Sequence, residues 1–303
     1  MKFYSNGKLL ITGEYLVLDG AKSLALPTKF GQNLEVNTIA NSKESILYWQ
    51  SFDESENVWF ACEFKLPSLQ ITTFSDEETA KKLQQILKEA KKENKQFLIQ
   101  KEAVKVKTML TFPINWGLGT SSTLINNVAS WAKINAFKLQ FSVFGGSAYD
   151  IANAQNNTAI LYQLKNKKPL IESIKFNPVF KDNLYFVYLN AKQNSRDAIA
   201  MYRKFTGDKT DLIAQISKIT TQICTVKTIV AFEKLIQEHE QIISKIIGIK
   251  PIQERLFIDY FGQIKSLGAW GGDFILATGN GKTTAYFKKK GYDVVIPFTE
   301  MIL

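Results

Sequence analysis

The stretch at residues 112–127 reads F-P-I-N-W-G-L-G-T-S-S-T-L-I-N-N and separates two different patterns. β-favouring apolar residues precede it, and a run compatible with a helix follows it. Between them lie Gly117, Gly119 and three hydroxyl residues, Thr120, Ser121 and Ser122. Glycines let a backbone approach a ligand closely, hydroxyl residues are good helix N-caps, and the free amides at the start of a helix attract anions. The stretch therefore predicts a strand, a polyphosphate-binding loop and a helix.

The loop does not match either of the two common nucleotide motifs. No G-K-[ST] closes it, so it is not a Walker A loop, and Ser122 stands where G-x-G-x-x-G needs its third glycine. Taken alone, such a turn is also compatible with ordinary strand-to-helix turn chemistry. Further stretches near the two ends of the chain are needed to decide between these interpretations.

Composition places the chain among soluble globular proteins. It has 303 residues, of which 45% are apolar and 22% charged, enough for one large domain or two ordinary ones. No apolar run approaches the roughly 18 residues of a membrane span, and the N-terminus lacks the pattern of a signal peptide. Two cysteines cannot form a disulfide framework, so we expect a reduced, cytoplasmic protein. The net charge of +10 suits anionic small molecules such as ATP, while the lysines are scattered among acids and form no arginine-rich stripe typical of nucleic-acid binding.

Hydrophobic periodicity predicts mixed α and β structure along the chain. We expect a continuous strand at residues 8–18, a helix at 76–95 capped by Ser75, continuous helix over 211–247 and a further helix at 253–266. The chain then closes with strand, helix and strand between residues 274 and 298. His239 falls on the apolar stripe of its helix, which favours a buried structural role over a catalytic one. A change of pattern near residue 165 predicts the domain boundary.

Three glycine-marked stretches, at residues 5–20, 113–123 and 265–276, together resemble the GHMP kinase superfamily. The first, N-G-K-L-L-I-T-G-E-Y-L-V-L-D-G from Asn6, is similar to the family element P-G-K-x-x-L-x-G-E-Y-x-V-L-x-G. The second is similar to P-x-x-x-G-L-G-S-S, with Thr120 in place of the first serine. The third, G-A-W-G-G-D from Gly268, is similar to the loop G-A-G-x-G-G. Their order and spacing span nearly the whole chain.

The resemblance implies a fold and a domain division. It implies a two-domain α+β kinase fold, with a domain like the second domain of ribosomal protein S5 followed by a ferredoxin-like α/β domain. We expect the N-terminal ATP-binding domain over residues 1–165 and the C-terminal domain over 166–303, with the active site in the cleft between them. A homodimer is the assembly considered; neither nucleic acid nor a membrane is expected as a partner.

The resemblance also implies where ATP and Mg²⁺ bind. The second stretch would wrap the ATP phosphates through its amides, and Ser121 matches the serine that helps to hold Mg²⁺. The ATP-binding residues expected on this basis are Pro113, Gly117, Leu118, Gly119, Thr120, Ser121 and Ser122.

The small-molecule acceptor is expected near the first and third stretches. Asp150, in S-A-Y-D, resembles the aspartate that is the presumed base on the acceptor hydroxyl, and Lys8 would stabilise developing negative charge. The expected acceptor-binding residues are Lys8, Glu14, Tyr15, Ser147, Lys192, Arg196, Gly271, Gly272 and Asp273. Lys192 and Arg196 would receive a phosphate already present on the acceptor.

Several of these residues have simpler interpretations. Ser147 and Asp150 have the spacing of a capping box. Glu14 could be an exposed strand residue and Lys8 a surface lysine, while Asp273 either hydrogen-bonds loop amides or starts a strand. Lys192 and Arg196 fit an ordinary solvated turn equally well.

The sequence also departs from the mevalonate kinase branch that it otherwise resembles. Residues 135–144 contain no acid, although that branch has an acidic Mg²⁺ ligand about a dozen residues before its aspartate. Trp270 stands where the third loop usually has a small residue. The function expected is an ATP-dependent kinase acting on a mevalonate-pathway intermediate, mevalonate or phosphomevalonate. The alternatives are a nucleotide- or metabolite-binding homologue without catalysis and an RNA-binding protein.

Overall fold

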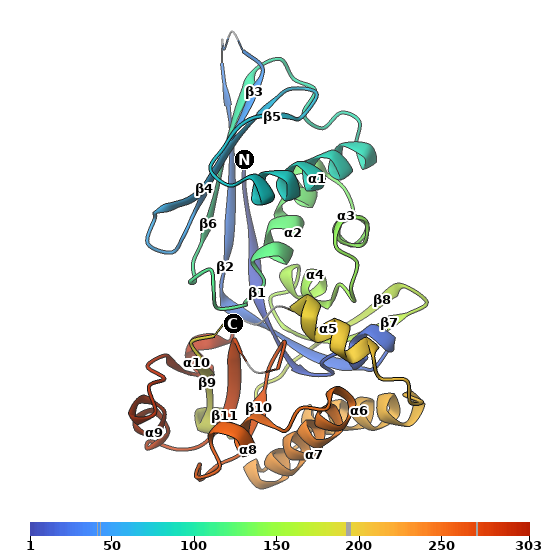
Figure 1. Cartoon of the computed structure of the whole chain (residues 1–303), viewed down its shortest axis with the longest axis vertical. Helices are drawn as coiled ribbons and strands as arrows, with labels where there is room; N and C mark the ends of the chain where they lie inside the picture. The colour runs from blue at the N-terminus through green and yellow to red at the C-terminus, as the bar shows by residue number, and fades with distance from the viewer. Residues whose placement is uncertain (41, 43, 192–194, 271) are drawn as a thin grey trace. The chain divides into compact units, whose positions relative to one another are not determined.

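The computed structural model describes all residues except 41, 43, 192–194 and 271 (Figure 1). The chain forms two compact units. Unit 1 combines Met1–Gly7, Phe30–Ile114 and Leu118–Gln155, and unit 2 combines Lys8–Lys29, Asn115–Gly117 and Asn156–Leu303. The units are discontinuous because two long strands, β1 (Lys2–Thr12) and β2 (Ser23–Ile39), each contribute residues to both. The expected division at residue 165 follows sequence order alone and stays a prediction.

Unit 1 contains a sheet with the strand order β5-β4-β3-β6-β2. Strand β3 runs parallel to β6, and the other neighbouring pairs are antiparallel. Its further elements are β3 Ile46–Phe52, β4 Val58–Lys65, β5 Gln70–Phe74, α1 Glu77–Glu93, β6 Ala103–Leu110, α2 Thr120–Ala132, α3 Ala136–Val143 and α4 Tyr149–Ala154.

Alternation along β3 divides the two faces of this sheet. Leu47 and Trp49 are buried in one core cluster with residues of α1, α2 and α3, and these helices lie together in Figure 1. Tyr48 and Gln50 point to the opposite face because successive strand side chains alternate. A hollow of about 530 Å³ on the sheet is lined by these two residues among others, and none of the expected site residues that the structure describes lines it.

Unit 2 contains an antiparallel sheet with the strand order β10-β11-β9-β12, and in addition the start of β2 pairs with β7, which pairs with β8. Its other elements are η1 Leu16–Asp19, β7 Ala159–Lys165, β8 Lys168–Ile174, η2 Lys181–Asn183, β9 Leu184–Tyr188, α5 Ser195–Arg203, α6 Thr210–Ile223, α7 Ile229–Ile247, α8 Ile252–Leu256, β10 Ile264–Ser266, β11 Phe274–Thr278, α9 Thr283–Lys289, β12 Val295–Pro297 and α10 Phe298–Met301.

The predicted α+β class is confirmed, as are the closing strand, helix and strand β11, α9 and β12. The likeness of the two halves to a ribosomal-protein domain and to a ferredoxin-like domain stays a prediction.

Four element predictions were wrong in their bounds. The strand expected at residues 8–18 ends at Thr12, because Gly13 takes a φ of 94° and lies so close to Ser23 that an added Cβ would meet its Oγ at 2.0 Å. Helix α1 is capped by Asp76, whose side chain accepts from the Thr79 amide, and not by Ser75.

The two other errors concern the C-terminal half. The helix expected over 211–247 is two helices, because the Thr228 side chain accepts from the Ala231 amide and starts α7 anew. The helix expected at 253–266 stops at Leu256, and Ile264 instead pairs with Ala277 as part of β10. Tertiary pairing outweighs helix propensity at such short apolar runs.

Candidate active site

The start of α2 presents backbone amides and one exposed hydroxyl. Its N-cap is Gly119, with a φ of 100° and no side-chain cap hydrogen bond, so the hydroxyl residues do not act as caps. Ser122 Oγ donates to the Gly119 carbonyl at 2.9 Å, and Thr123 Oγ1 donates to the same carbonyl at 3.0 Å. Ser122 is buried, whereas Ser121 is exposed. The N-terminal end of a 13-residue helix and the Ser121 hydroxyl are thus left for an anion and its counterion.

The flanking expected ATP-binding residues have different surroundings. Leu118 is a buried core residue, while Pro113 and Thr120 are half-buried. Gly117 takes a φ of 69°, a conformation that favours glycine.

Asp150 lies in the first turn of α4 and is half-buried. The capping box suggested by its spacing from Ser147 does not form, because the N-cap is Ala148, with a φ of 60° and no side-chain cap bond. Asp150 is therefore not needed to start the helix. One turn on, the buried Asn153 donates from Nδ2 to the Gly7 carbonyl at 3.1 Å, which ties α4 to the residue before Lys8. Sequence reasoning missed Asn153, since a single asparagine in a helix gives no distinguishing signal.

Within unit 2, parts of all three glycine-marked stretches line one small recess. Lys8, Gly117, Gly268 and Asp273 are among its lining residues. A Cβ at Gly117 would lie 2.5 Å from the carboxyl carbon of Asp273, so this carboxylate packs directly on the glycine.

The recess is lined in part by two aromatic rings, those of Trp116 and Phe274. The Trp116 ring meets the Phe274 ring edge to face at 5.4 Å and lies 6.3 Å from that of Tyr188. The remaining free volume is about 10 Å³. That is at most the space of one water molecule. Trp270, in the third loop, is buried with a φ of 42°, and Gly272 is buried as well.

Three expected acceptor-binding residues cannot be placed with their side chains. Lys192 and Gly271 lie outside the described residues. Arg196 belongs to α5, and its side chain is likewise outside what the structure describes. Their assignments stay predictions.

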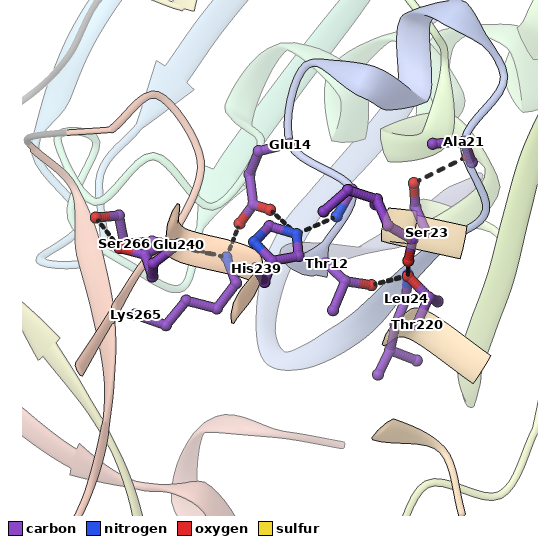
Figure 2. A network of polar contacts seen from close by, with 12 residues as sticks. Thr12, Glu14, Ala21, Ser23, Leu24, Thr220, His239, Glu240, Lys265 and Ser266 are labelled. Atoms are coloured by element: carbon purple, nitrogen blue, oxygen red, sulfur yellow. Dashed lines mark hydrogen bonds and ion pairs between the residues drawn. The ribbon is translucent and has the colours of Figure 1, made fainter. Parts of the chain in front are cut away.

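Glu14 is not an exposed strand residue but the centre of a buried polar cluster (Figure 2). Its Oε1 accepts from Lys265 Nζ, and its Oε2 lies 3.2 Å from His239 Nε2. Lys265 Nζ also donates to the Ser266 carbonyl at 2.8 Å and lies 3.8 Å from Glu240 Oε1. Ser266 Oγ donates to Glu240 Oε2 at 2.9 Å. The side chains of Glu14, His239, Lys265 and Glu240 are at most 1% exposed.

Burial shifts the pKa values within this cluster. Desolvation raises the pKa of Glu14 despite the opposing charge of Lys265, and it raises the pKa of Glu240 to about 8. Desolvation, helped by Lys265, holds the pKa of His239 well below its ordinary value. His239 is thus a neutral core residue, which agrees with its predicted burial. Lys265 and Glu240 were missed, although a carboxylate inside the apolar run at residues 8–18 does require a buried cation.

Tyr15 lies beside this cluster and is also buried. It takes a φ of 62° and stacks on Tyr202 with ring centroids 5.6 Å apart. The burial of Glu14 and Tyr15 argues against direct contact with an acceptor in this conformation, and their role in binding one stays a prediction.

Solved structures with the same architecture identify the fold. The chain is similar to a mevalonate kinase from Methanococcus jannaschii, with a TM-score of 0.69 and 17% identity over 96% of this chain and 94% of the other. It is also similar to phosphomevalonate kinase from Streptococcus pneumoniae in complex with phosphomevalonate and AMPPNP, with a TM-score of 0.65 and 14% identity over 96% and 95%. This is the GHMP kinase fold.

Sequence identity to the solved kinases with this fold is low. Galactokinase from Lactococcus lactis, complexed with galactose, matches with a TM-score of 0.65 and 12% identity over 95% of this chain and 87% of its own. No protein-family model and no curated protein sequence matches the chain. The predicted resemblance is therefore confirmed for the fold by TM-scores of 0.65–0.69, whereas identities of 12–17% do not determine a substrate.

In the described part of the chain, every helix is too short or too polar to span a lipid bilayer. Within the same residues, no group of three or more histidine, cysteine, aspartate or glutamate side chains is arranged to hold a metal ion.

Proposed function

We propose that the protein is an ATP-dependent kinase that transfers the γ-phosphoryl group to a small-molecule acceptor, a mevalonate-pathway intermediate. The observation that carries the proposal is the start of α2, where uncapped amides and the exposed Ser121 follow Gly119 in a GHMP kinase fold. Two proteins with this fold were solved with such acceptors, namely R-mevalonate in the L. major enzyme and phosphomevalonate in the S. pneumoniae enzyme. The acceptor proposed is therefore mevalonate or phosphomevalonate.

ATP would be held through its phosphates at the α2 N-terminus. Phosphoryl transfer depends mainly on alignment and charge neutralisation, which backbone amides and a helix dipole supply. The donor set near the site fits Mg²⁺ as an ion held mostly by phosphate and water. Magnesium keeps several waters and often uses few protein ligands, so Ser121 is proposed as its protein ligand. When bound, the ion neutralises charge on the transferring phosphate.

Asp150 and Lys8 are the residues proposed for the chemical step. A hydroxyl acceptor attacks the γ-phosphorus, the bond from that phosphorus to the ADP oxygen breaks, and the hydroxyl proton passes to the Asp150 carboxylate. The positive charge of the Lys8 ammonium stabilises the negative charge that develops on the transferring group. Asp150 is free to act as a base because it does not cap α4. For a phosphate acceptor, whose oxygen is already ionised, Asp150 matters less, and Lys8, Lys192 and Arg196 matter more.

An ADP-release assay tests this function. The full-length protein is incubated with Mg²⁺-ATP and, separately, with mevalonate, phosphomevalonate, homoserine and sugars. We expect acceptor-dependent ADP release with mevalonate or phosphomevalonate. If ADP is released only with homoserine or only with a sugar, the proposed acceptor is wrong and the proposed kinase activity is supported.

A binding protein without catalysis is the second candidate, and one observation favours it. The recess beside Lys8 and Asp273 has a free volume of only about 10 Å³, and the buried Trp270 lies in the adjoining loop. Saturable ATP binding without ADP release for every acceptor would select this candidate over the kinase.

A further inference from the structure

The buried cluster around Lys265 contains one more acid than it can neutralise. Among the residues that the structure describes, two carboxylates, Glu14 and Glu240, face a single ammonium, and all three side chains are at most 1% exposed. An uncompensated charge in such a place is very costly, so a group there takes up or releases a proton instead.

His239 does not supply the missing positive charge. The Gly13 amide donates to His239 Nε2 at 3.0 Å, so this nitrogen carries a lone pair and the ring is neutral. Its Nδ1 has no hydrogen-bond partner in the described part of the chain. A protonated ring would also face Lys265, whose charge disfavours it.

Two carboxylate oxygens of the cluster have no hydrogen-bond donor among the described residues, and these are the atoms on which a proton can reside. Oε2 of Glu14 has no donor among the described residues and lies 3.2 Å from the His239 nitrogen, which is itself an acceptor. Oε1 of Glu240 has no hydrogen-bond partner there either, since Lys265 Nζ is 3.8 Å away. A proton on either acid would give the cluster one negative and one positive charge. Within the described part of the chain, Tyr15 is a further titratable group beside these acids, and it stays neutral because burial raises its pKa.

The cluster joins the first and third glycine-marked stretches. Glu14 lies directly after the glycine turn that ends β1, and Lys265 and Ser266 lie directly before the third loop. Helix α7 also belongs to the cluster, to which it contributes His239 and Glu240. Figure 2 shows the Glu14 carboxylate pointing at both His239 and Lys265.

We infer that Glu14 and Glu240 share one proton, and that this protonated cluster is a positioning network that holds the Gly13 turn against the base of the third loop. Loss of the proton leaves a buried net negative charge, which is relieved when the two segments separate and admit water. The effect on catalysis rests on the proposed kinase function, whereas the coupling of the two segments does not. Because the acids are coupled, the proton belongs to the pair and not to one residue.

Amide hydrogen exchange tests the coupling without turnover. Two amides report on the two segments: Gly13, which donates to His239 at 3.0 Å, and Leu267, which donates to the Phe274 carbonyl at 3.2 Å. If opening releases one proton, their opening constants, corrected for intrinsic exchange, rise together by up to about tenfold per pH unit between pH 6 and 8. The amide of Thr111, which donates to Gly31 in unit 1, serves as the internal control.

Isosteric variants separate proton sharing from general destabilisation. Glu240→Gln and Glu14→Gln each mimic a protonated acid, so we expect the pH-dependent rise at both amides to fall below about twofold per unit. Glu233→Gln, on the same helix and hydrogen-bonded to Thr278 outside the cluster, keeps the wild-type slope. Wild-type slopes in both cluster variants, or independent behaviour of Gly13 and Leu267, would overturn the inference.

A turnover measurement adds the catalytic consequence. If the protein is a kinase, the wild-type kcat declines as pH rises through about 8, whereas Glu240→Gln keeps its kcat, with KM for ATP unchanged in both. A merely structural role would not produce this difference in the pH profile. Absence of turnover in the wild type would reject the proposed function, and the exchange slopes would still decide the positioning network.

Discussion

Lys265 Nζ donates to Oε1 of Glu14, and the two side chains are 0% and 1% exposed. The pair connects the end of β1 with β10, two segments 251 residues apart in sequence. A buried ion pair is weak evidence for stability, because desolvation offsets most of its Coulomb energy. The pair is important because removing either partner alone leaves the charge of the other buried without compensation.

Lys265→Met should destabilise the protein strongly. The substitution leaves two buried acids without a cation, and breaking a buried pair in this way costs about 3–5 kcal/mol. Urea unfolding followed by circular dichroism measures the change. Adding Glu14→Leu to the same chain should recover part of the loss, because both partners are then apolar. A double variant as unstable as the sum of the two single variants would contradict the coupling.

Replacing Glu240 with glutamine should make stability less dependent on pH. Burial raises the pKa of Glu240 in the folded protein to about 8 from its ordinary value of about 4.5. Its contribution is therefore complete below about pH 4.5 and is lost as pH rises to about 8, by at most about 1.4 kcal/mol per pH unit. The lowered pKa of His239 acts oppositely and destabilises the fold as pH falls below 6.5.

Unfolding free energies between pH 7 and 8.5 isolate the glutamate. We expect the wild type and Glu233→Gln to lose stability over this range, and Glu240→Gln to lose clearly less. Parallel curves for all three proteins would show that the buried acids hold no extra proton.

Gly117→Ala should destabilise the folded protein more than Gly146→Ala. Both glycines have positive φ, 69° and 82°, so each substitution carries a backbone cost of about 1–2 kcal/mol. Only at Gly117 would the new Cβ also meet the Asp273 carboxyl carbon at 2.5 Å, whereas Gly146 has nothing within 4 Å. Thermal unfolding compares the two, and Asp273→Ala should partly rescue Gly117→Ala. Equal losses would place the Asp273 carboxylate elsewhere.

Asp150→Asn should reduce turnover of a hydroxyl acceptor and leave ATP affinity intact. A positioned general base contributes about 10²–10⁴-fold, so a loss of kcat in that range is expected. Stability should fall by no more than about 1 kcal/mol, since Asp150 forms no cap and contributes only a charge in the first turn of α4. Asp211→Asn, in the first turn of α6, is the matched control and should keep full activity. An unchanged kcat for Asp150→Asn with mevalonate would remove this residue from the mechanism.

Both cysteines should resist thiol reagents in the native protein at pH 8. Burial raises the pKa of Cys62 to about 12 and that of Cys224 to about 11, and the thiolate is the reactive form. Colorimetric labelling should proceed only after unfolding in urea, when two thiols per chain react. Rapid labelling of the folded protein would contradict the burial of Cys62 and the partial burial of Cys224.

Local sequence signals were sufficient for the elements that depend on neighbours in the chain. The Gly117–Ser122 pattern predicted the start of α2, and the apolar stripe predicted that His239 is buried. Order and spacing of three glycine-marked stretches predicted the GHMP kinase fold. Predictions failed where the interaction partners are distant in sequence. The residues of β10 were predicted to be helical, but Ile264 pairs with Ala277 in a sheet. An exposed position was considered for Glu14, but its side chain is buried in an ion pair with Lys265.

By itself, then, the sequence determined the fold class, the glycine turns and the helix that begins at Thr120, because backbone conformation and hydrophobic periodicity are properties of neighbouring residues. Tertiary structure alone decided that Ser121 is exposed while Ser122 is buried, that Asp273 packs on Gly117, and that two acids share one lysine. Burial and charge pairing depend on which distant segments meet, and no local pattern records that.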